Sequence, residues 1–116
     1  MTNIDATQAI EDDIRNAKAV VETRDALLRL KTNRDFQTIF MKGYLEKESI
    51  RLVMLKANPN VQVELVQKRI IADIDAIGSF YAYMNKILSD GDQAETYIDS
   101  ANDTLSSMDK NMEEHE

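Results

Sequence analysis

Residues 63–88 read VELVQKRIIADIDAIGSFYAYMNKIL, the most regular stretch of the chain. Its apolar side chains recur three and four positions apart, so they share one face of an α-helix that turns once in about 3.6 residues. The positions on this face are Val63, Val66, Ile70, Ile74, Ile77, Tyr81, Met84 and Leu88. The pattern predicts a long helix over about residues 60–89, with a heptad-like seam for another helix.

Two further helices are predicted upstream. A narrower seam of the same spacing runs through Ile10, Ile14, Ala17, Val21, Arg24 and Leu28. It predicts a helix from a capping box at Asp5 and Gln8 to about Lys31. Residues 36–57 are apolar on more than one side, which predicts a helix that packs between two neighbours. The residues between them favour a turn and an antiparallel hairpin over one bent helix.

The clearest turn signal is Ser89-Asp90-Gly91-Asp92, where Gly91 can cap one helix and Asp92 the next. A fourth, shorter helix is expected after it, fraying past Met108. The predicted fold is all-α: an antiparallel bundle of three long helices with a shorter acidic C-terminal helix. Residues 1–116 are expected to form one domain, with a neutral core over 1–89 and an acidic helix and tail over 90–116.

The charge of the chain is concentrated at its end. The net charge is −7, yet residues 90–116 hold nine acidic residues against Lys110 alone. Such a segment repels phosphate backbones, so nucleic-acid binding is not expected. The simple interpretation is a solubilising end. The alternative is a docking surface for a basic partner, with Asp92, Glu95, Asp99 and Asp103 as its residues.

The composition excludes several chemistries. The chain has no cysteine, and its single histidine, His115, lies in the tail, so triads with a Cys or His and thiolate zinc sites are not expected. Glu22 and Asp25 form a Glu-x-x-Asp pair without a companion on another helix. We therefore predict no catalytic residue, no metal and no cofactor. A secretion signal and a membrane span are not expected either.

The seams offer more apolar surface than one small core requires, which favours self-association over a monomeric bundle. The contact residues predicted on this basis are Ile10, Ile14, Val21, Leu28, Val63, Val66, Ile70, Ile74, Ile77, Tyr81, Met84 and Leu88. The expected function is that of a non-enzymatic helical protein–protein interaction module.

Residues 34–59, RDFQTIFMKGYLEKESIRLVMLKANP, and residues 74–78, IDAIG, resemble small uncharacterised helical proteins of tailed bacteriophages. The resemblance covers roughly residues 25–90 and brings no catalytic or binding residues with it. It implies a virion component or assembly factor, found in the virion or the host cytoplasm, whose partner is itself or another phage protein. The alternative that it implies is a small acidic protein that binds and diverts a host protein.

Overall fold

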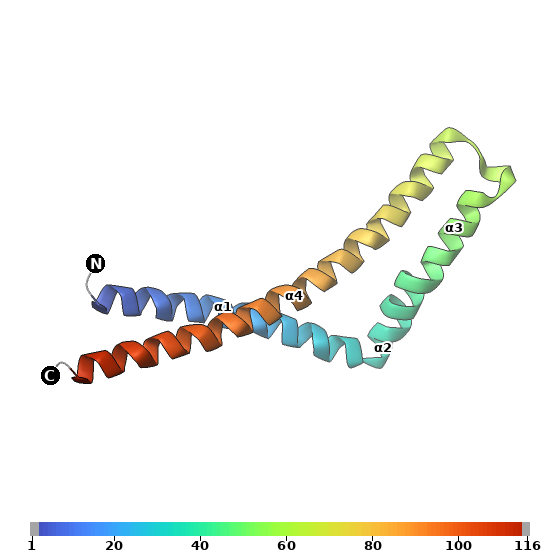
Figure 1. Ribbon diagram of the computed structural model, residues 1–116. Coiled ribbons are helices and arrows are strands. Elements are labelled where there is room, and N and C mark those ends of the chain that lie inside the picture. The colour runs from blue at the N-terminus through green and yellow to red at the C-terminus, as the bar shows by residue number, and fades with distance from the viewer. Residues whose placement is uncertain (1–2, 115–116) are drawn as a thin grey trace. The chain divides into compact units, whose positions relative to one another are not determined.

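The computed structural model describes residues 3–114, and within this range the chain is helical with no strand. Its elements are α1 (Asn3–Thr32), α2 (Arg34–Phe36), η1 (Gln37–Glu48), α3 (Ser49–Ala57), η2 (Pro59–Val61) and α4 (Glu64–Glu114) (Figure 1). The segment η1 has π-helical winding and η2 is a single 3₁₀ turn. The predicted all-α class is confirmed.

The chain folds into two compact units. Unit 1 is formed by the residues up to Ala26 together with those from Ile87 onward. Unit 2 is formed by Leu27–Lys86. The helices α1 and α4 each contribute residues to both units.

Unit 1 is an antiparallel pair of helices. Asp13 of α1 contacts Tyr97 of α4, whereas Arg24, further along α1, contacts Glu95, which lies earlier in α4. The two segments therefore run in opposite directions. Ile14 of α1 and Ala101 of α4 are buried in this unit.

Unit 2 is a helical hairpin in which η1 and α3 pack against the first part of α4. Leu52 of α3 is 2% exposed and forms the core with Ile70 and Ile77 of α4. Four half-buried residues pack around these three: Tyr44, Leu45, Leu55 and Ile74. Within η1, Phe40 and Tyr44 both contact the ring of Phe80 on α4.

Two predicted helix ends are confirmed. The helix α1 ends at Thr32, and Asn33 caps the next helix by accepting a 3.0 Å hydrogen bond from the amide of Phe36. The helix α3 ends at Ala57, because Asn58 adopts the extended backbone that a following proline favours. The start of α1 differs from the prediction: the helix already includes Asn3, so Asp5 lies inside it and is not an N-cap.

The predicted turn at residues 89–92 is wrong. The helix α4 runs through it as one helix of 51 residues and continues past Met108 to Glu114. A bundle of three long helices and a separate acidic one is therefore not formed. Gly91 has no positive φ and is buried. The missing side chain of Gly91 serves a close helix approach, described below, and not a turn.

Winding changes within the helical stretch that follows α2. In η1 the backbone hydrogen bonds span five residues instead of four, which is rare over so long a segment. At Gly43, a Cβ atom would stand only 2.9 Å from the carbonyl oxygen of Thr38, five residues earlier. The close approach at Gly43 is thus to the backbone of its own helix.

Candidate functional site

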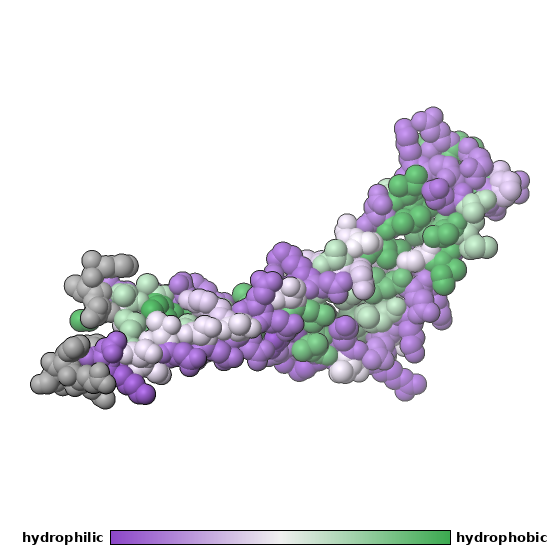
Figure 2. Space-filling view, in the orientation of Figure 1, coloured by the Kyte–Doolittle hydropathy of each residue, from purple (hydrophilic) through white to green (hydrophobic). Residues whose placement is uncertain are grey.

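The helix α3 presents a second apolar face that no other part of unit 2 covers. Ile50, Val53 and Met54 are 60%, 54% and 68% exposed. Because successive residues of an α-helix turn by about 100°, Ile50 and Met54 lie on the side of α3 opposite to Leu52, and Val53 lies next to them. We call them the outer face of α3. On the side seen in Figure 2, apolar residues gather over the α3 and adjoining α4 part of unit 2.

The structure divides the predicted contact residues between buried and exposed positions. Ile14, Ile70, Ile77 and Met84 are buried, and Ile10, Val21, Ile74 and Leu88 are half-buried. Leu28, Val63, Val66 and Tyr81 are exposed. Much of the predicted seam is thus used inside the two units. The exposed outer face of α3 was not among the predicted contact residues, although the apolar pattern on two sides of residues 36–57 was its signal.

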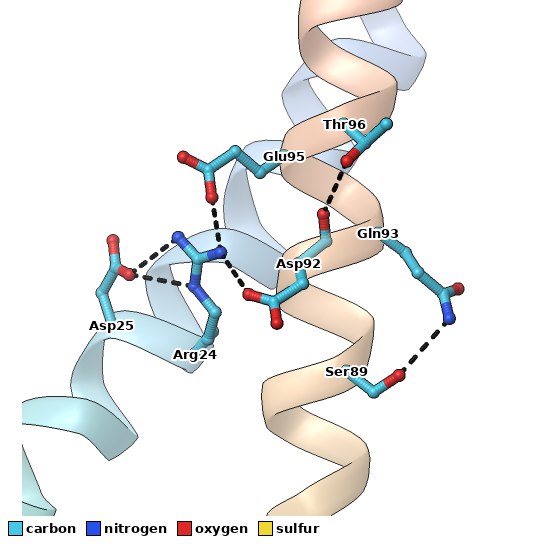
Figure 3. A network of polar contacts seen from close by, with 7 residues as sticks. All are labelled: Arg24, Asp25, Ser89, Asp92, Gln93, Glu95 and Thr96. Carbon is cyan, nitrogen blue, oxygen red and sulfur yellow. Dashed lines mark hydrogen bonds and ion pairs between the residues drawn. The ribbon is translucent and has the colours of Figure 1, made fainter.

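In unit 1, the guanidinium of Arg24 lies among three carboxylates (Figure 3). Its Nη1 donates to Glu95 at 2.6 Å and to Asp92 at 2.8 Å, both on α4. Its Nε and Nη2 donate to Asp25 at 3.2 Å and 3.1 Å. These hydrogen bonds raise the pKa of Arg24 above its ordinary value, and the bond to Glu95 contributes the most.

Gly91 allows this arrangement. An added Cβ at Gly91 would stand 2.2 Å from the Cβ of Arg24, which is too short for two non-bonded carbon atoms, so one of the helices would have to shift. The helices α1 and α4 therefore approach each other closely here, and Arg24 is buried although it is charged. The three carboxylates keep this buried guanidinium paired, which removes the penalty of an isolated charge.

This network changes the interpretation of the predicted acidic docking residues. Asp92 and Glu95 bind Arg24 within unit 1, although both side chains remain more than half exposed. Asp99 and Asp103, further along α4, are exposed. Asp99 and Asp103 would therefore be more accessible to a basic partner than Asp92 and Glu95.

A shallow groove lies between the two helices of unit 1, and we call it the unit 1 groove. Its lining consists of Asn16, Ala17 and Val20 from α1 and Asp90, Gln93, Ala94 and Tyr97 from α4. The hydroxyl of Tyr97 donates to Asp13 at 3.4 Å. Partial burial, followed by the nearby charge of Asp13, raises the pKa of Tyr97.

The two units differ in charge. Unit 1 contains fifteen acidic and four basic residues, whereas unit 2 contains six acidic and ten basic ones. This contrast is not visible along the sequence, because the acidic residues of α1 come close to those of the C-terminal part of α4 only when these two helix segments pack together. Unit 1 is strongly negative and unit 2 is positive.

The described side chains include no group of three acidic or histidine residues placed to hold a metal ion. Asp25, half of the Glu-x-x-Asp pair, binds Arg24, and His115 lies outside the described residues. None of the helices described has the length and apolarity that a membrane span requires.

Comparison of the chain with models of protein families, with curated proteins and with solved structures finds no match in any of the three. The resemblance to the phage proteins stays a prediction.

Proposed function

We propose that this protein is a non-enzymatic helical interaction module that associates with copies of itself. The observation that supports the proposal is the outer face of α3, where three adjacent aliphatic or thioether side chains are more than half exposed. Isolated apolar residues on a surface are ordinary, but a contiguous face on a short helix favours an interaction site. The setting in a phage virion or its assembly rests on the resemblance alone and belongs to the proposal.

Full burial of Ile50, Val53 and Met54 would contribute roughly 3–5 kcal/mol, since each is already partly covered. Association loses about 4 kcal/mol or more in rigid-body freedom. The outer face of α3 can therefore start an association but needs additional contacts or charge attraction to make it stable.

Ile50→Glu is expected to weaken self-association at least tenfold, because it places a charge in the centre of the outer face of α3. The measurement is molar mass by light scattering over a wide protein concentration range, with circular dichroism to check the fold. Leu65→Glu is the matched control, because Leu65 is also an exposed aliphatic residue (74%) and lies outside this face. A wild-type protein that stays monomeric throughout, or an Ile50→Glu variant that assembles like it, would contradict the proposal.

A second candidate function is binding of a basic host protein by unit 1. The observation that favours it is the excess of fifteen acidic over four basic residues in that unit. On this hypothesis Asp99→Asn combined with Asp103→Asn weakens capture of a basic partner and leaves self-association unchanged. Capture that is insensitive to both substitutions in a pull-down would refute it.

A further inference from the structure

The two apolar surfaces described above carry opposite charges at their edges. On α3, Arg51 lies beside Met54 and Lys56 beside Val53, so basic side chains border the outer face on both sides. Arg51 is 60% exposed although it pairs with Glu48. The unit 1 groove has Ala17, Val20 and Ala94 in its lining, with Asp90 at its edge and Asp13 bound to Tyr97.

We infer that the outer face of α3 in one copy docks into the unit 1 groove of a second copy. This inference rests on the proposed self-association and specifies which surfaces meet. The small side chains of Ala17 and Ala94 let a helix approach closely. The larger Ile50, Val53 and Met54 then supply the apolar contact area.

Charge favours this pairing over the two symmetric alternatives. Two α3 faces would bring together two units that each have ten basic and six acidic residues, and two grooves would bring together two units with fifteen acidic residues each. Only the mixed pairing places a positive unit against a negative one. Its attraction acts over a Debye length of about 8 Å at physiological salt, so added salt weakens it.

The contact is heterologous, since each copy contributes a different surface to it. Every copy then carries one outer face of α3 and one unit 1 groove, and each can bind a different neighbour. A variant damaged in its face still has an intact groove, and a variant damaged in its groove still has an intact face. Two variants that each fail alone can therefore associate with each other.

The experiment uses Ile50→Glu as the face variant and Val20→Lys as the groove variant. The new lysine repels the basic edges of α3, and the new glutamate repels the acidic groove. We expect each variant alone to associate at least tenfold more weakly than the wild type. An equimolar mixture is expected to form complexes of two chains or more, measured by light scattering and weakened by salt. Gln93→Lys, at an exposed position of the groove, is the second groove variant if Val20→Lys fails to fold.

The outcomes separate the inference from the proposed function. If the groove variants assemble like the wild type while Ile50→Glu does not, the α3 faces pair with each other, which overturns the inference and leaves self-association standing. A folded pair of variants that does not associate on mixing also overturns it. A wild-type protein that is monomeric at every concentration removes the proposed function as well.

Discussion

Gly91→Ala is expected to lower the free energy of unfolding by up to about 2 kcal/mol. The added Cβ would lie 2.2 Å from the Cβ of Arg24, so α1 and α4 must separate or deform. Such overpacking typically destabilises by about 1–3 kcal/mol, and the better helix propensity of alanine offsets about 1 kcal/mol of that. The measurement is urea unfolding followed by circular dichroism.

Gly78→Ala is the matched control for this prediction. It makes the same substitution in the same helix, but nothing lies within 4 Å of the added Cβ. With no clash to oppose it, the gain in helix propensity is expected to stabilise the protein by about 1 kcal/mol. The two substitutions should thus have opposite signs. If Gly91→Ala stabilises the protein as Gly78→Ala does, the close approach at Arg24 is absent.

Leu52→Ala is expected to lower the free energy of unfolding by about 2–5 kcal/mol, the largest effect of any truncation proposed for this chain. Leu52 is 2% exposed and touches the core around Ile70 and Ile77, so its removal loses burial and leaves a cavity. Urea unfolding measures the change.

Leu65→Ala removes the same atoms from a leucine that is 74% exposed, and we expect it to change stability by less than about 0.5 kcal/mol. Similar losses for both leucines would mean that Leu52 is not at the centre of unit 2.

Local signals allowed the helices and two of their ends to be predicted. Asn33 and the Asn58-Pro59 pair act through their own backbone preferences, so the sequence around them suffices. The seam periodicity likewise placed Ile70 and Ile77 on one apolar face, which packs inside unit 2, whereas their predicted role in self-association stays a prediction. These features depend on neighbours a few residues away.

Features that depend on distant contacts were not predictable in the same way. Ser89-Asp90-Gly91-Asp92 has the composition of a turn, but Gly91 lies inside α4, where its missing Cβ leaves room for Arg24, which is far away in the sequence. The same distant pairing brings Asp92 and Glu95 to Arg24 and so changes their predicted role as docking residues. The unit 1 groove depends on two helix segments whose pairing no local pattern specifies.

The π-helical winding of η1 affects how the chain would tolerate a change in its length. A wider turn holds more residues than an α-turn, so loss of one residue within Gln37–Glu48 can be absorbed by rewinding part of η1 as an α-helix. Loss of one residue within α3 cannot be absorbed in this way. It would rotate the later side chains of α3 by about 100° relative to the earlier ones and turn the buried side of the helix away from α4. Single-residue deletions should therefore accumulate in the first segment and be absent from the second among functional variants of this gene.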